Sequence, residues 1–428
     1  MKFAWASILL LVGATSASAI AAPAAAPSPA ELKASVTAAV KKGVHFLAGR
    51  QNGGDFGREQ YSPQPGHTAL CVLALIKSGV SVQDPCILRS TAPLLKYAYA
   101  QDPKDRFAVY NCALTLMALD AAWSAQSVQG PKGLSPHYRA MANMAAALQG
   151  FQGGDGGWGY AAVDNHRDLS NTQMALLGLW SAQRNKVPVA TGVWDNARMY
   201  VSNLHQRDGG WIYSAGANEE RHSMAAAGIS SLAICQITAA AAAAGTNPNA
   251  KVYRSGGANL PKSGTVVVRR DVRANNANPV DLMRRGFAWF NAKGLATRNL
   301  ETYYLYALER ACTLTGVQSV AGKEWYPTVA QGLVSAQAAD GSWSGEPTPT
   351  VATCWALLVL SRSTAQTIGQ YPSPLGGTYS PGAAGAGAGD AGAAAVNPNA
   401  IPTLPAAGAA AAQTQPSASQ PLKHSEMP

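Results

Sequence analysis

The sequence predicts an all-α protein that forms a single (α/α)6 toroid, a barrel of six helical hairpins, with disordered termini. The main observation is a phrase that occurs three times, as Gln152-Gly-Gly-Asp-Gly-Gly-Trp158, Gln206-Arg-Asp-Gly-Gly-Trp211 and Gln337-Ala-Ala-Asp-Gly-Ser-Trp343. Apolar, helix-like runs flank each copy. Repetition at about fifty residues is typical of an array of supersecondary units.

The N-terminus has the features of a secretory signal peptide over residues 1–19. Lys2 precedes an apolar stretch from Phe3 to Val12, and Ala17-Ser18-Ala19 follows. The apolar stretch is too short to span a bilayer, and an A-x-A sequence suits signal peptidase. We therefore expect an exported protein, periplasmic or secreted, without a transmembrane segment. Residues 20–34 are an Ala/Pro-rich linker.

Two kinds of helix alternate in the expected toroid domain, residues 35–365. The helix before each phrase, as in Arg139–Leu148, has apolar residues at i, i+3 and i+4, which indicates one buried face. The helix after it, as in Asn111–Leu119 or Thr353–Leu360, is apolar all round and should be buried on every side. The first helix of each pair is thus expected outside and the second inside, with N-caps at Ser170 or Asn171, Ser223 and Thr350.

Degraded copies of the phrase complete the set of six. Gln51–Phe56 and Gln101–Phe107 carry Phe in the Trp position, and a unit around Phe287–Gly294 has lost the phrase. The spacing between the copy at Gln206 and the unit around Phe287–Gly294 is wider than the others, which predicts a surface insertion over residues 239–279. Residues 366–428 are rich in Gly, Ala, Pro and Ser, so we expect a disordered tail.

The phrase itself predicts a structural role. Asp-Gly-Gly supplies a turn with positive φ, Gln can satisfy open backbone groups at a helix end, and the Trp indole can cover the junction. We expect this role for the following residues: Gln152, Trp158, Gln206, Trp211, Gln337 and Trp343.

The overall composition points to few partners. The net charge of +10 is scattered, and its densest stretch, Lys262 to Arg285, is interpreted as a solvated loop and not as a nucleic-acid site. Four of the six cysteines lie in apolar helical runs, which predicts mostly buried thiols and at most one or two disulfides. We expect no metal ion and no other cofactor.

The repeated phrases resemble the QW motifs of the terpenoid cyclase and protein prenyltransferase superfamily, the squalene-hopene cyclase-like proteins with prenyltransferase and squalene oxidase repeats. The resemblance covers about residues 35 to 362. It implies a toroid whose inner helices surround an apolar cavity for isoprenoid chains, and, if the protein is an enzyme, a cyclase or mutase of the isomerase class.

The resemblance does not extend to the catalytic motifs. Class II cyclases of this family protonate an alkene with the middle Asp of Asp-x-Asp-Asp-Thr, whereas the matching segment here is Asp168-Leu-Ser-Asn-Thr172, with Ser170 in the donor place. A serine hydroxyl is far too weak an acid for that step. Asp164 stands four residues upstream as a substitute. The zinc-binding Asp-x-Cys pair of the prenyltransferases is matched only by Asp84-Pro-Cys86, in a connection between helices.

Three functions remain open. The first is binding or transformation of an isoprenoid or other lipid in the toroid cavity, with Asp164, Asp168 and Asn171 as candidate catalytic residues. Its candidate ligand-binding residues are His67, His222, Tyr303 and Trp355. The second is a non-catalytic scaffold that binds a protein or glycan. The third is a glycan lyase or hydrolase, which needs paired carboxylates such as Asp164 and Asp168 or Glu219 and Glu220.

Overall fold

The computed structural model describes residues 27–57, 64–102, 105–124, 135–162, 164–219, 221–243, 277–297, 300–368, 371–375 and 378–379. Six helices form an outer layer: α1 (Pro29–Gly49), α3 (Pro85–Tyr97), α5 (Pro136–Phe151), α7 (Thr191–Asn203), α9 (Pro279–Lys293) and α11 (Trp325–Ala336). Six form an inner layer: α2 (Gly66–Lys77), α4 (Ala108–Ser124), α6 (Leu169–Arg184), α8 (His222–Ala243), α10 (Thr302–Thr315) and α12 (Pro349–Leu360). The rest are α13 (Ser363–Ile368) and two antiparallel hairpins, β1 (Ser319–Val320) with β2 (Lys323–Glu324) and β3 (Tyr371–Pro372) with β4 (Thr378–Tyr379).

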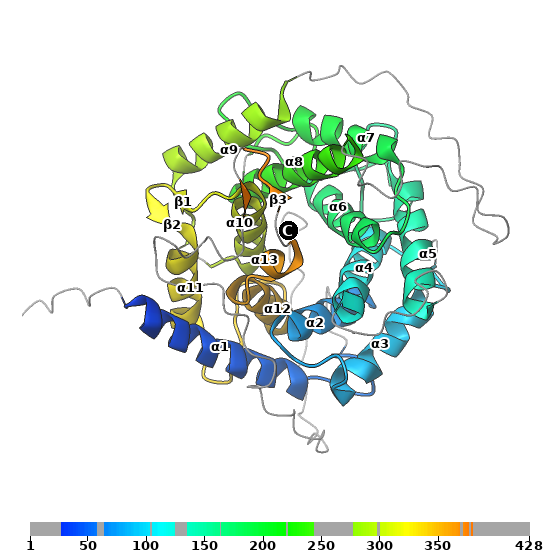
Figure 1. Ribbon diagram of the computed structural model, residues 1–428, viewed down its shortest axis with the longest axis vertical. Coiled ribbons are helices and arrows are strands. Elements are labelled where there is room, and N and C mark those ends of the chain that lie inside the picture. Colours follow the sequence, from blue (N-terminus) through cyan, green and yellow to red (C-terminus); the bar gives the residue numbers. More distant parts are fainter. Residues whose placement is uncertain are drawn as a thin grey trace, which may run out of the picture.

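The twelve long helices form a closed (α/α)6 toroid, which confirms the predicted fold class (Figure 1). Each inner helix packs against the next, and α12 packs against α2, so the inner ring has no gap. In the outer layer α1 packs against α11 and α12, which joins the first and last hairpins. Helix α13 lies inside the inner ring, against α10 and α12.

Burial follows the two sequence patterns. In α6 every residue from Leu169 to Gln183 is buried, whereas α5 buries one stripe, formed by Ala140, Met141, Met144, Ala145 and Leu148. The predicted N-caps need correction. Asp168 caps α6 in place of Ser170 or Asn171, and Thr348 caps α12 in place of Thr350, because each side chain accepts the N–H three residues on.

The three full copies of the repeated phrase share one tryptophan contact. The indole N–H donates to the carbonyl ten residues earlier, at 2.7 Å for Trp158 to Leu148, 2.9 Å for Trp211 to Val201 and 2.8 Å for Trp343 to Leu333. The three indoles are buried. The tryptophan therefore fastens the loop to the end of the preceding outer helix.

The glutamine of the phrase reaches a neighbouring hairpin in two of the three copies. Gln152 Nε2 donates to the Val193 carbonyl of α7 at 3.0 Å, and Gln337 Nε2 donates to the Ala39 carbonyl of α1 at 2.9 Å. Gln206 Nε2 instead donates to Leu204, within its own unit. The Gln337 contact links the last unit to the first and so helps to close the ring.

A substitution at Gly228 tests how tightly the QW tryptophan is packed. A Cβ atom on Gly228 of α8 would lie 2.4 Å from the Trp211 indole, so we expect Gly228→Ala to lower the free energy of unfolding by about 1–3 kcal/mol. Gly150→Ala in α5 is the matched control, since nothing lies within 4 Å of its added Cβ. Alanine there should stabilise by about 0.5–1 kcal/mol. If urea unfolding showed the same change in stability for Gly228→Ala and Gly150→Ala, the Trp211 indole would not be tightly packed against Gly228.

The structure changes several expected boundaries. Helix α1 begins at Pro29, inside the expected linker, with a capping box between Ser28 and Glu31. Helix α13 and the β3–β4 hairpin lie in part of the expected tail, and α8 extends to Ala243 inside the expected insertion. The signal peptide, residues 244–276 and residues 380–428 lie outside the described residues.

All six cysteines are buried, and the sulfur atoms of Cys354 and Cys71 lie 3.6 Å apart as a thiol contact. The stretch His222–Ala241 has the length and apolarity of a membrane span, but 78% of it is buried inside the toroid, as an inner helix should be.

Candidate functional site

Three inner helices begin at the same end of the barrel, and side chains from their first turns meet there. Tyr110 of α4 and Tyr303 of α10 both hydrogen-bond to Ser170 of α6, and the Ser170 Oγ to Tyr303 Oη distance is 2.9 Å. The two tyrosine hydroxyls are 3.4 Å apart. Since α4 and α10 lie on opposite sides of the inner ring (Figure 1), this contact crosses the lumen.

Further aromatic side chains from the QW loops extend this cluster. Tyr160 stacks on Tyr110 with ring centroids 5.9 Å apart, and its hydroxyl lies 3.2 Å from that of Tyr213. Phe107 meets Tyr160 edge-on. Phe107, Tyr110, Tyr160 and Tyr213 are all half-buried. We call Phe107, Tyr110, Tyr160, Ser170, Tyr213 and Tyr303 the tyrosine mouth.

Asp168 is a buried carboxyl directly below the mouth. It accepts the backbone N–H of Asn171 at 2.8 Å and the Asn171 side-chain amide at 2.9 Å. Burial is the main reason that its pKa rises from 3.8 to about 6, although both hydrogen bonds oppose the rise. Asp164 lies in the loop above, where it accepts the N–H groups of His166 and Tyr160. The structure therefore brings Asp168 and Asn171 together as a cap and gives Asp164 a turn-forming role.

The raised pKa of Asp168 predicts a pH-dependent stability. The folded state holds this proton more tightly than the unfolded state. The contribution of Asp168 to the free energy of unfolding therefore falls as the pH rises from about 4 to 6, and it stays constant above pH 6. Asp168→Asn should remove this slope and raise stability at pH 8 by about 1–3 kcal/mol. Denaturant unfolding of both proteins at pH 4 and pH 8 measures it, with Asp164→Asn as the control. If Asp168→Asn were less stable than wild type by more than about 1 kcal/mol at pH 8, the prediction would be wrong.

The predicted ligand-binding residues are separated. Tyr303 is in the mouth, and Trp355 lies behind it, edge-on to Tyr303 and stacked on Tyr306. His67 is buried at the start of α2, with its Nδ1 3.4 Å from Gln64 Nε2. The His222 ring packs on Trp289, Phe290 and Tyr304, and its Nε2 lies 3.1 Å from the Gly294 carbonyl oxygen. It therefore faces the outer layer and not the mouth.

A polar network that the sequence analysis missed continues from the mouth into the lumen. Gln173 Nε2 donates to Tyr303 Oη at 2.5 Å, and Arg310 donates to Gln173 Oε1 at 2.7 Å. The Arg310 guanidinium lies 4.0 Å from the centre of the Tyr306 ring, a cation–π contact. The only sequence signal was the presence of Gln173 and Arg310 in otherwise apolar inner helices.

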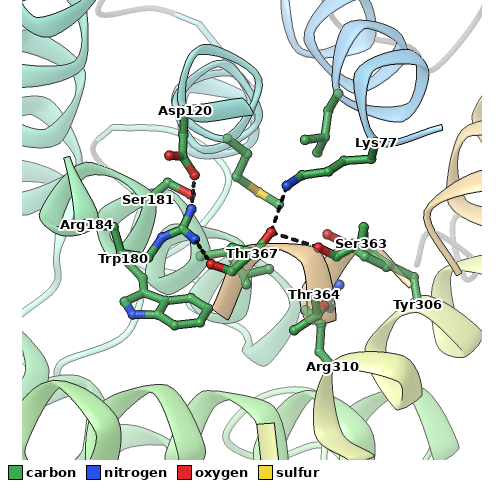
Figure 2. Close-up of a pocket in the computed structure, with 13 residues that line it drawn as sticks. Lys77, Asp120, Trp180, Ser181, Arg184, Tyr306, Arg310, Ser363, Thr364 and Thr367 are labelled. Atoms are coloured by element: carbon green, nitrogen blue, oxygen red, sulfur yellow. Dashed lines mark hydrogen bonds and ion pairs between the residues drawn. The ribbon is translucent and has the colours of Figure 1, made fainter. Parts of the chain in front are cut away.

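A small cavity lies in the opposite half of the lumen, between the inner helices and α13 (Figure 2). Its volume is about 30 Å³, room for one or two waters or a small ion, whereas ligand pockets are about ten times larger or more. Thus a chamber for an isoprenoid chain is not open at this place. Among the described residues, no three His, Cys, Asp or Glu side chains come together as a metal site would require.

Comparison with known proteins finds a likeness in fold. No protein-family model and no curated protein matches the sequence. Solved structures that match include the type II terpene cyclase MstE from Scytonema: a variant with its substrate geranylgeranyl dihydroxybenzoate (TM-score 0.45, 11% identity), a variant with its product merosterolic acid A (0.45, 10%) and the apo enzyme (0.43, 12%). Each match covers 77–78% of this chain and 98–99% of the cyclase.

Proposed function

We propose that this protein is an exported, non-catalytic toroid that binds an isoprenoid or other lipid at the tyrosine mouth without cyclising it. The observation that carries the proposal is the state of Ser170. It stands where the resembling cyclases have their proton donor, and its hydroxyl is fully buried and hydrogen-bonded to Tyr110 and Tyr303. A serine hydroxyl is far too weak an acid to protonate an alkene, and the Glu346 carboxylate near the mouth accepts hydrogen bonds from the Tyr303 N–H and the Thr302 hydroxyl.

The nearest carboxyl supports the same conclusion. Asp168 has a raised pKa, as a general acid would, but its oxygens accept hydrogen bonds from Asn171. The raised pKa makes Asp168 a weaker acid than an ordinary carboxyl, whereas protonation of an alkene needs a carboxyl of strengthened acidity. Asp168 therefore serves as an N-cap of α6.

The mouth itself suits a ligand with an apolar body and a polar head. Phe107, Tyr110 and Tyr160 offer partly exposed ring faces, against which a hydrocarbon chain can pack. The hydroxyls of Tyr160 and Tyr213 can donate to an alcohol or carbonyl oxygen. The lumen below is crossed by side chains, so the ligand would lie at the mouth and not deep in the barrel.

A combined binding and product assay tests both halves of the proposal. The mature protein is incubated with geranylgeraniol or squalene, bound lipid is measured by equilibrium partition, and extracts are analysed by gas chromatography and mass spectrometry. We expect saturable binding and unchanged lipid. Tyr160→Ala should weaken binding about tenfold, since one aromatic contact contributes about 1.4 kcal/mol.

Tyr99→Ala is the matched control, because Tyr99 is 55% exposed and its hydroxyl donates to the Pro136 carbonyl of α5 and not to a residue of the mouth. A cyclised product would overturn the non-catalytic half. Absence of saturable binding, or an equal loss in the Tyr99 variant, would overturn the lipid half.

The filled lumen favours a second candidate, a scaffold whose toroid surface binds a protein or glycan. The polar network from Tyr110 to Arg310 and the cavity of about 30 Å³ support it. In the same assay this candidate gives neither lipid binding nor a product, which separates it from the first.

A further inference from the structure

The cavity beside α13 is unusually rich in positive charge. Its lining includes Lys77 of α2, Arg184 of α6 and Arg310 of α10, with Asp120 of α4 as the one carboxylate among the lining residues. Figure 2 shows Lys77 and Arg184 converging from opposite sides towards Thr367 of α13. Charges buried inside a protein require partners, because desolvation is costly.

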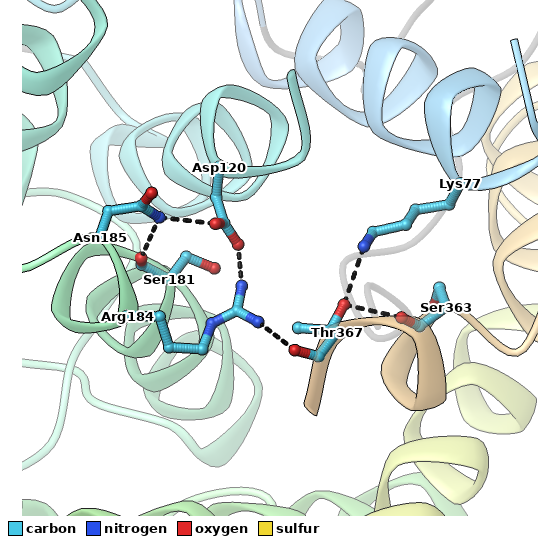
Figure 3. Close-up of polar contacts among 7 residues, drawn as sticks. All are labelled: Lys77, Asp120, Ser181, Arg184, Asn185, Ser363 and Thr367. Atoms are coloured by element: carbon cyan, nitrogen blue, oxygen red, sulfur yellow. Dashed lines mark hydrogen bonds and ion pairs between the residues drawn. The ribbon is translucent and has the colours of Figure 1, made fainter. Parts of the chain in front are cut away.

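The one carboxylate is engaged by one of the three cations. Asp120 forms an ion pair with Arg184, and Asn185 Nδ2 donates to its other oxygen at 2.6 Å (Figure 3). The Arg184 guanidinium also donates to the Thr367 carbonyl at 2.8 Å. Lys77 Nζ donates to Thr367 Oγ1 at 2.9 Å, a neutral partner. The positive charges of Lys77 and Arg310 are thus left without a facing carboxylate in the lining.

Arg310 supplies an independent sign of an additional ligand. It is 1% exposed, its Nη2 donates to Gln173, and the Tyr306 hydroxyl interacts with both Arg310 and Ser363. Its Nε and Nη1 have no hydrogen-bond partner among the described residues, and the same is true of Ser363 Oγ on the facing α13. Buried donors are nearly always satisfied, so such a group of donors indicates an unoccupied partner.

We propose that this cavity is an anion site, in which one small inorganic anion such as phosphate or chloride is held by Lys77, Arg310 and Ser363 and fastens α13 to the inner helices. The cavity volume suits an ion of this size. The proposal does not rest on the function assigned to the tyrosine mouth, to which Arg310 is linked through Gln173 and Tyr303.

The titration of Lys77 agrees with a cluster of like charges. Burial, and to a smaller extent the charge of Arg184, lower its pKa from 10.5 to about 8, while Glu309 opposes the shift. Glu309 acts on Lys77 and Arg310 from outside the cavity lining, where it accepts hydrogen bonds from the backbone N–H and the hydroxyl of Thr364. An anion in the cavity would restore the charged form of Lys77.

Thermal unfolding in a series of salts tests the site. At constant ionic strength, phosphate, sulfate and chloride replace gluconate, which is too large for the cavity. We expect a saturable rise in the midpoint with at least one of the small anions. Arg310→Met and Lys77→Met should each raise the apparent dissociation constant of that anion at least tenfold. Arg284→Gln is the control, since Arg284 is exposed on α9.

A rise that is the same in wild type and in the Arg310 and Lys77 variants would overturn the site, as would no difference among the anions. Should the variants not fold, crystals of the wild-type protein soaked in bromide decide the matter. An anomalous peak between Lys77 Nζ and the Arg310 guanidinium is expected, and water alone at that position overturns the proposal.

Discussion

Replacement of Trp211 by alanine will lower the free energy of unfolding by about 3–5 kcal/mol. The indole is fully buried, and its N–H donates to the Val201 carbonyl of α7. Its ring also fills the space beside Gly228 of α8 and Gly286 of α9, where an added Cβ would clash with it. One side chain thus joins three helices, and its removal leaves both a cavity and an unpaired carbonyl.

Guanidinium unfolding measures this loss, with Trp211→Phe and Leu88→Ala as comparators. The Phe variant keeps most of the apolar contact but not the hydrogen bond, so it should lose less than the Ala variant. Leu88 is 49% exposed, and its replacement should change stability by less than about 0.5 kcal/mol. A Trp211→Ala loss below about 1 kcal/mol would show that the QW phrase does not hold the toroid together.

The sequence predicted the toroid well because the repeated phrase and the helix patterns both have local physical causes. Turn glycines such as Gly156 and Gly209 have positive φ, which glycine alone adopts without strain. The all-round apolar character of helices such as α12 required burial on every side, and α12 lies in the inner ring. Neither inference needed knowledge of distant contacts.

The interior of the barrel could not be predicted in the same way. Which side chains meet in the lumen depends on the rotation of each helix about its axis, and this turned His222 outward to Trp289. Helix α13 has only six residues, too few to show a period, and it lies beyond the last repeat. Lys77 ends one inner helix and Arg310 lies inside another, and nothing in the sequence indicated that either side chain enters the lumen.

The side chains in the lumen bear directly on function. A polar network runs from Tyr303 through Gln173 to Arg310 and takes up part of the lumen. The repeated phrase helps to hold the ring together, whereas any chemistry depends on lumen residues such as these. This separation of fold from activity is general, because function belongs to sites placed on folds.

The second large effect is the pH dependence that Glu309 gives to the free energy of unfolding. It is fully buried in α10 and accepts hydrogen bonds from the N–H and hydroxyl of Thr364 in α13. Burial is the main cause that raises its pKa from 4.5 to about 7, against the hydrogen bonds from Thr364 and the nearby arginines. The folded state therefore binds this proton more tightly than the unfolded state. Stability should fall as pH rises from about 4.5 to 7 and stay constant above pH 7.

We expect Glu309→Gln to be more stable than wild type at pH 8 by up to about 3 kcal/mol, since a shift of one pKa unit corresponds to 1.36 kcal/mol. Near pH 4.5 the two proteins should be equally stable. Asp168 contributes below pH 6, so the difference that develops between pH 6 and 7 belongs to Glu309. Denaturant unfolding in steps of half a pH unit, for wild type, Glu309→Gln and Asp168→Asn, measures both windows. A Glu309→Gln protein whose stability follows the wild-type curve through pH 6–7 would show that the buried carboxyl does not hold a proton at neutral pH, and that α13 is fastened to the barrel by a charged glutamate.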